Sequence, residues 1–111
     1  MVALASLADA AYLSGEVRTV ETFKYGKFVA KIKAPNKLGT CTSFFTYWNG
    51  PKWYPERWNE IDIEIVPSVE ADFTKGPLST NIIFGDGNYR EERHIYDPEF
   101  NPGNEWHVYE M

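Results

Sequence analysis

The sequence predicts an all-β, antiparallel fold, and three observations support this class. From Gly15 onward, short stretches rich in β-forming residues alternate polar and apolar side chains with a period of two. Turn residues separate these stretches, and no helical period is sustained over three turns. The chain of 111 residues is short enough for at most one domain. We therefore expect a single domain over residues 1–111, with residues 1–13 as a poorly defined leader or the remnant of a first strand.

The first expected strands are Glu16–Thr22 and Lys27–Ala34, both of which alternate polar and apolar residues. Because only Tyr25-Gly26 and its neighbours separate them, we expect these two strands to be antiparallel neighbours. An aromatic strand is predicted over Thr42–Trp48, where β-branched and aromatic residues dominate. A polar loop over Asn49–Arg57 then leads to the next strand.

The second half of the chain predicts a surface loop followed by three strands. The loop covers Ser68–Pro77, and the first of these strands is Ser79–Phe84. Gly85–Asn88 is a strong turn signal, and it leads into a strand over Arg90–Tyr96. The last expected strand, Glu105–Met111, runs to the end of the chain without a closing turn. We therefore expect a sheet that is incomplete at this end.

The charge balance and the apolar runs exclude two classes of partner. The formal net charge is -5, with 16 acidic and 11 basic residues, so no positive field attracts a phosphate backbone. We expect no nucleic-acid partner. No apolar run reaches the length of about 20 residues that a membrane-spanning helix needs, so we expect no membrane span. Met1–Ala11 is apolar, but it lacks a basic start and contains Asp9, so it is not a convincing signal peptide. The sequence does not determine the oligomeric state.

The single cysteine and the aromatic residues set two further expectations. Cys41 has no intrachain partner for a disulfide, and we expect it to be a small buried apolar residue. Aromatic residues make up 16% of the chain. Such a content suits a dense β core, and it equally suits a surface on which flat ligands such as sugar rings stack.

The most informative motif is Glu60-Ile61-Asp62-Ile63-Glu64. On a strand, side chains alternate between two faces, so the three carboxylates share one face while Ile61 and Ile63 enter a core. Crowding like charges is costly, and proteins accept that cost mostly where the carboxylates have a function. A solvent-exposed strand face is the competing interpretation.

Paired carboxylates are the groups that glycoside hydrolysis requires, one as nucleophile or base and the other as proton donor. The backbones of Glu60 and Glu64 should lie about 13 Å apart, at roughly 3.3 Å per residue. Their side chains can lean together towards the separation of about 5 to 5.5 Å that is typical of retaining enzymes. Asp62 lies between them and is expected to hydrogen-bond the nucleophile. Trp58 is expected on the same face, as a platform for a sugar ring.

Phe45 and Tyr47 alternate on one face of the preceding aromatic strand, where they suit a sugar-binding cleft. Ordinary core packing is the alternative for these two aromatic residues.

The chain resembles glycoside hydrolase family sixteen, in particular the lichenase-like branch of bacterial β-glucanases, on several segments in register. The signature of that branch is Glu-Ile-Asp-Ile-Glu on a strand of the substrate cleft. Together with that signature, the matching segments span nearly the whole chain from Ser14 on: Ser14–Thr19, Tyr25–Phe28, Ser43–Tyr47, Trp58–Glu60 and Trp106–Tyr109.

This resemblance implies an antiparallel β-jelly-roll sandwich with a concave substrate cleft, and a retaining mechanism. It implies that Glu60 is the nucleophile, that Asp62 is its hydrogen-bonding assistant, and that Glu64 is the general acid and then the base. It implies a secreted hydrolase of a β-glucan. We expect no cofactor and assign no metal-binding residues, and the sequence does not determine whether the full domain holds a structural calcium. Laminarinase-like relatives carry an extra residue and a β-bulge between the two glutamates. The spacing here therefore favours mixed-linkage glucan as the polysaccharide substrate.

The resemblance also implies a set of substrate-binding residues: Glu16, Arg18, Phe45, Tyr47, Trp58 and Asn81. The chain departs from the family pattern at Ile83, where lichenases usually have a tyrosine near the acid/base. It departs again at Ser14, which replaces a disulfide-forming cysteine. It is also shorter than the family's catalytic domains, so we expect the sandwich to be incomplete at both termini.

Two alternatives to an active glucanase stay open from the sequence, a truncated inactive fragment and a carbohydrate-binding module without turnover. The histidines His94 and His107 are interpreted as structural or surface residues, because neither is accompanied by the ligand spacing of a metal site. Gly85–Asn88 has too few ligands for a dedicated calcium site and is interpreted as a turn.

Overall fold

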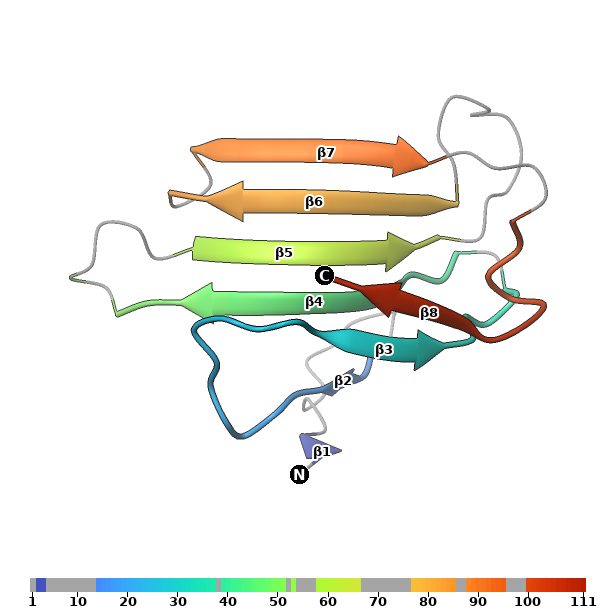
Figure 1. The fold of residues 1–111 in the computed structure, drawn as a ribbon, viewed down its shortest axis with the longest axis horizontal. Coiled ribbons are helices and arrows are strands. Elements are labelled where there is room, and N and C mark those ends of the chain that lie inside the picture. The colour runs from blue at the N-terminus through green and yellow to red at the C-terminus, as the bar shows by residue number, and fades with distance from the viewer. Residues whose placement is uncertain are drawn as a thin grey trace, which may run out of the picture.

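A computed structural model describes residues 2–3, 14–37, 39–51, 53, 58–66, 77–85, 88–95 and 100–111, with the backbone alone for residues 2–3. Within these residues the chain forms eight strands, all pairings are antiparallel, and no helix is present (Figure 1). The predicted all-β class is confirmed. None of the described residues forms a helix long and apolar enough to cross a bilayer.

The largest sheet contains four consecutive strands in the order β4-β5-β6-β7 (Figure 1). They are β4 (Thr42–Asn49), β5 (Trp58–Ile65), β6 (Leu78–Phe84) and β7 (Tyr89–Ile95). The predicted strands in these four regions are confirmed, with bounds that differ by one residue or two. Their sequences are rich in aromatic and β-branched residues, or alternate in polarity, which favours paired strands.

The hairpin between β6 and β7 is built on a glycine. Gly85 has φ +66°, a conformation that glycine adopts without steric cost. The backbone N–H of Asn88 donates to the carbonyl of Gly85 at 3.1 Å, and the Asn88 side chain donates to the same oxygen at 2.6 Å. The predicted turn is confirmed at these two residues. The loop predicted for Ser68–Pro77 lies outside the described residues except for Pro77.

A second, two-stranded layer pairs β3 (Val29–Ile32) with β8 (His107–Glu110). Phe28 and Met111 extend this ladder by exchanging two backbone hydrogen bonds of 2.9 and 3.0 Å. In Figure 1, β8 crosses in front of β4, and β3 lies beyond the β4 edge of the large sheet. The core lies between the two layers, and its members are Ala34, Ile63, Ile65 and Tyr109, with Ile32, Phe44, Leu78, Phe100 and Met111 packed against them.

The prediction for the first strands was wrong in extent and in pairing. The strand expected over Glu16–Thr22 ends at Val17, because β2 covers Glu16–Val17 only. Its partner is β1 (Val2–Ala3), whereas β3 pairs with the distant β8. Val17 and Val20 are both 80% exposed, so the alternation in this stretch does not bury an apolar face.

The isoleucines of β5 divide into buried and exposed residues. Ile63 is 8% exposed and Ile65 is fully buried, as expected for core residues, but Ile61 is 44% exposed. The prediction that Ile61 enters the core was wrong. The β3–β8 layer covers the end of β5 that carries Ile63 and Ile65, whereas Ile61 lies beside the exposed Ile82 of β6.

This difference gives a matched test of the core. Ile65→Val should lower the free energy of unfolding by about 1 kcal/mol, because it removes one methylene from a filled site. Ile61→Val makes the same chemical change on the same face of the same strand, and it should cost less than half as much because the side chain is exposed. Urea titration followed by tryptophan fluorescence measures both. Equal losses would contradict the assignment of the core.

Tyr109 carries a polar atom that the core does not satisfy. Its side chain is buried, and its hydroxyl meets no hydrogen-bond partner among the described residues. Burial raises the pKa of this hydroxyl above its ordinary value of 10.0, because the charged form is poorly solvated there. The folded state therefore resists the ionisation of Tyr109 that the unfolded state permits.

We expect Tyr109→Phe to stabilise the chain by about 1 kcal/mol at pH 7, because it removes an unsatisfied buried hydroxyl. The wild type should lose stability as the pH rises above about 10, because Tyr109 ionises at a lower pH in the unfolded chain than in the folded chain. Tyr109→Phe should lack this part of the alkaline loss. Denaturant titrations between pH 7 and 11 test both statements, and a destabilised variant would contradict them.

Candidate active site

The three carboxylates of β5 lie on one face of the large sheet, as the alternation predicts. The antiparallel register continues without interruption from Trp58 to Ile65 on the β4 side and from Glu60 to Ile65 on the β6 side. Residues opposite one another in such a ladder share a face. Three rows of side chains therefore cross this face: Ser43, Glu64, Ser79 and His94; Phe45, Asp62, Asn81 and Glu92; Tyr47, Glu60, Ile83 and Arg90.

Glu60 is oriented by the tryptophan two positions before it. The indole N–H of Trp58 donates to Glu60 Oε2 at 2.8 Å. Trp58 was expected here as a sugar platform, and this hydrogen bond adds a polar contact that the expectation did not include. A charge-assisted hydrogen bond of this length fixes the direction of the carboxylate. One oxygen of Glu60 is thus engaged by the protein.

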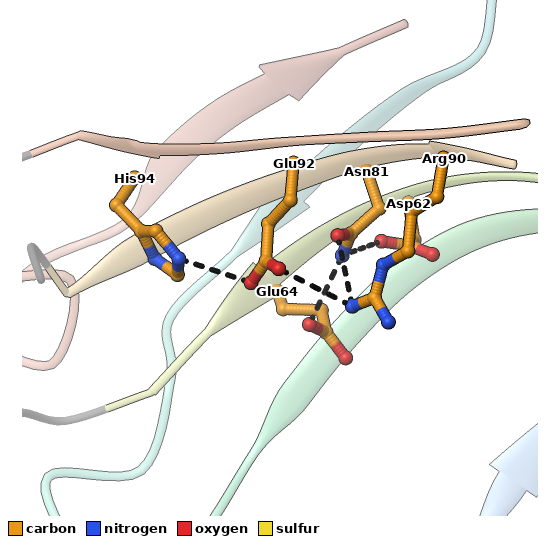
Figure 2. A network of polar contacts seen from close by, with 6 residues as sticks. All are labelled: Asp62, Glu64, Asn81, Arg90, Glu92 and His94. Carbon is orange, nitrogen blue, oxygen red and sulfur yellow. Dashed lines mark hydrogen bonds and ion pairs between the residues drawn. The ribbon is translucent and has the colours of Figure 1, made fainter.

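Asp62 and Glu64 share one donor on the next strand. Asn81 Nδ2 donates to Asp62 Oδ1 at 2.6 Å and to Glu64 Oε2 at 3.2 Å (Figure 2). Asn81 is 3% exposed and Asp62 is also buried, so the contact lies in a partly desolvated part of the sheet where hydrogen bonds are strong. The hydrogen bond described for Asp62 thus comes from Asn81, whereas the sequence expectation was a contact with Glu60.

The aromatic strand supplies an apolar border to the carboxylates. Phe45 lies opposite Asp62, and Tyr47 lies opposite Glu60. Both rings are exposed, at 38% and 54% respectively, so they are available to a ligand on this face. Exposed rings beside carboxylates suit a sugar, because its C–H face packs on an aromatic ring while its hydroxyls meet polar groups.

Ile83 lies opposite Glu60, and it is buried on the carboxylate face. The expectation from the family pattern was a position near the acid/base Glu64, but the register puts Ser79 opposite Glu64 instead. Ser79 is buried, and its hydroxyl has no hydrogen-bond partner among the described residues.

Cys41 is exposed, so the prediction of a buried apolar cysteine was wrong. It precedes β4 by one residue, and the period of two gives it the same parity as Ser43, on the carboxylate face. Its sulfur lies 3.5 Å from Ser43 Oγ and 4.0 Å from Glu64 Oε1. The thiol is therefore a neighbour of the candidate acid/base.

Strand β7 adds three charged or titratable residues that the sequence did not assign to the site. Arg90 Nη2 lies 3.4 Å from Glu92 Oε2, and His94 Nε2 lies 3.0 Å from Glu92 Oε1. Arg90 Nη2 also contacts Asn81 Oδ1 at 3.5 Å. Figure 2 shows these side chains as one connected group with Asp62 and Glu64. The alternation of these residues in the sequence indicated that they share one face of a strand. Only the pairing of β7 with β6 shows that this face is the one that carries the carboxylates.

Other candidate residues lie apart from this group. Glu16 belongs to β2 and Arg18 follows it, and both are exposed on a small sheet formed with β1. His107 packs its ring against Phe100, with ring centroids 4.7 Å apart, in agreement with a structural role. No group of three or more metal-ligating side chains occurs in the described part of the chain.

Comparison with known proteins now identifies the family. The profile of glycosyl hydrolases family 16 matches residues 3–111. A β-glucanase of Bacillus subtilis strain 168 is 36% identical over 110 residues, which cover 97% of this chain and 41% of that protein. A β-glucanase of Fibrobacter succinogenes is 35% identical over 101 residues, which cover 86% of this chain and 28% of that protein.

A xylanase/beta-glucanase of Ruminococcus flavefaciens is 33% identical over 104 residues, which cover 91% of this chain and 12% of that protein. The chain therefore spans less than half the length of each of these relatives. No solved structure matches the chain at a significant level. The match over residues 3–111 shows that the chain belongs to glycosyl hydrolases family 16.

Proposed function

We propose that this chain carries the catalytic strand of a retaining endo-β-glucanase, which hydrolyses O-glycosidic bonds within a β-glucan. The observation that carries the proposal is the arrangement around β5. Glu60 is held by Trp58, whereas Asp62 and Glu64 are held by a single amide of Asn81. Membership of family 16 supports the same reaction class.

In the first step, the carboxylate of Glu60 attacks the anomeric carbon of the bound sugar while Glu64 donates its proton to the departing glycosidic oxygen. The bond to the leaving sugar breaks, and a covalent glycosyl-enzyme forms on Glu60. The indole N–H of Trp58 engages Oε2 of Glu60, which directs the other oxygen towards the substrate. Asp62 supports the pair from its position between the two glutamates.

In the second step, Glu64 accepts a proton from a water molecule, which attacks the same carbon and releases Glu60. The two inversions give net retention at the anomeric carbon. Asn81 donates to Glu64 Oε2 at 3.2 Å, whereas Glu64 Oε1 has the longer contact of 4.0 Å with the Cys41 sulfur.

Mixed-linkage β-glucan is the substrate we favour. The uninterrupted register between Glu60 and Glu64 is that of a strand without a bulge, which is the pattern of the lichenase-like branch. The similarity to proteins named β-glucanase supports a glucan as the substrate class. Extracellular action on a polymer accords with this substrate, and we include secretion in the proposal.

Replacement of the nucleophile tests the central assignment. Glu60→Gln should lower the release of reducing ends from barley β-glucan at least about a hundredfold, because the amide neither attacks nor departs as a carboxylate does. Glu91→Gln is the matched control on β7. Glu91 lies on the opposite face of the sheet, where its pKa is lowered because Tyr89 and Arg93 donate hydrogen bonds to it.

The control should retain wild-type activity. Equal activity of Glu60→Gln and the wild type would refute the role of Glu60. Glucan binding without turnover by the wild-type chain would instead indicate a carbohydrate-binding protein.

Removal of the acid/base gives a different signature. Glu64→Ala should lose about 100-fold to 10,000-fold in turnover of glucan, the usual contribution of a positioned proton donor and acceptor. With an aryl glycoside whose leaving group needs no proton, added azide should restore turnover. Azide then attacks the glycosyl-enzyme directly and yields a β-glycosyl azide, which NMR identifies. An α-glycosyl azide would show that Glu64 is the nucleophile and would reverse the two assignments.

A further inference from the structure

Asn81 must present its amide in one orientation to serve both carboxylates. Its NH₂ group faces Asp62 and Glu64, so its carbonyl oxygen points towards β7 (Figure 2). The opposite orientation would put an acceptor against two carboxylates, which is repulsive. The buried carbonyl oxygen then requires a donor of its own, because an unsatisfied buried acceptor is costly.

Arg90 supplies that donor from the neighbouring strand. Its Nη2 lies 3.5 Å from Asn81 Oδ1, so a positive charge is close to the oxygen end of the amide. A cation at the acceptor end polarises the amide and strengthens the hydrogen bonds that its NH₂ group donates. Among the residues that β4, β5, β6 and β7 bring to this face, all of which are described, Arg90 is the only permanently charged cation.

The partners of Arg90 fix its position. Glu92 lies directly opposite Asn81 in the register, and its carboxylate contacts both Arg90 and His94. The Glu92 carboxylate adds a fourth negative charge to the face that carries Glu60, Asp62 and Glu64, and the guanidinium of Arg90 offsets part of it. The same Arg90 nitrogen thus contacts both acceptors, Glu92 Oε2 at 3.4 Å and Asn81 Oδ1 at 3.5 Å.

We propose that Arg90 is a positioning residue for the acid/base, which acts on Glu64 through the side-chain amide of Asn81. The inference rests on the proposed role of Glu64. No contact joins Arg90 to Glu64 among the described residues, so its effect on the acid/base passes through Asn81. We expect the main loss in the step in which Glu64 transfers a proton. Glu60 accepts a separate hydrogen bond from Trp58, so we expect the nucleophilic attack to depend less on Arg90.

The test compares Arg90→Met with Arg93→Met. Arg93 lies on the same strand but on the opposite face, where it pairs with Glu91 at 2.7 Å, and methionine removes charge and donors from either site while keeping an unbranched side chain. Arg90→Met should lower kcat/KM on β-glucan about tenfold, a part of what a positioned proton donor contributes. The loss should be in kcat, with KM unchanged. Arg93→Met should match the wild type.

A second substrate separates positioning from general damage. A 2,4-dinitrophenyl β-glycoside of a gluco-oligosaccharide departs without protonation, so its kcat/KM should fall no more than about twofold in Arg90→Met. Equal losses on both substrates would show a merely structural role. Unchanged activity on both would also overturn the proposal.

A measurement that needs no catalytic turnover tests the role of Arg90 independently of the proposed function. In a chain labelled with ¹⁵N-asparagine, exchange of the Asn81 NH₂ protons with water should be several-fold faster in Arg90→Met than in the wild type and Arg93→Met. The Asn81 signal is identified by its loss in Asn81→Asp. If the wild type hydrolyses no glucan, the proposed function fails, and the exchange rates alone decide whether Arg90 orders the amide.

Should Arg90→Met fail to fold, Glu92→Gln removes the charge that anchors Arg90 and should change the exchange in the same direction. Equal exchange rates in the wild type and the variant would overturn the inference.

Discussion

The side-chain amide of Asn81 joins the two central strands of the sheet at the point where negative charge is most concentrated. It donates to Asp62 at 2.6 Å and to Glu64 at 3.2 Å. Three carboxylates at alternate positions of one strand repel one another, and water cannot fully screen them because Asp62 and Asn81 are buried. The donors that offset this repulsion come from β5 itself at Trp58 and from β6 at Asn81. The arrangement of the site therefore depends on the pairing of β5 with β6.

The same alternation that gathers the carboxylates also builds the core. Ile63 and Ile65 alternate with Asp62 and Glu64 in the sequence and point to the opposite face, where they pack in the core with Tyr109 of β8 and with Ile32 of β3. A slip of one residue in the β4–β5 or β5–β6 register would exchange the two faces, burying carboxylates and exposing isoleucines. Burial of Ile65 thus specifies the register that sets Glu60, Asp62 and Glu64 on one face. Stability and chemistry are linked through the direction of the side chains on β5.

The large sheet and its carboxylates were predictable from the sequence because local signals determine them. β-forming residues define β4, the period of two defines the two faces of β5, and Gly85 with Asn88 marks the hairpin between β6 and β7. The features that could not be predicted from the sequence depend on contacts between distant segments. The exposure of Ile61 follows from where the β3–β8 layer ends, and the pairing of β3 with β8 joins segments far apart in the chain. Arg90 can be assigned to the site only once β7 is paired with β6.

In the mechanism that we propose, Glu60 forms a covalent bond to the sugar. The most direct test is to incubate the chain with a 2-deoxy-2-fluoro β-gluco-oligosaccharide that carries a good leaving group, so that the glycosyl-enzyme accumulates. Proteolysis and mass spectrometry then locate the added sugar. We predict one sugar adduct per chain, on Glu60. An adduct on Glu64, or glucan hydrolysis that inverts the anomeric configuration with no adduct, would contradict it.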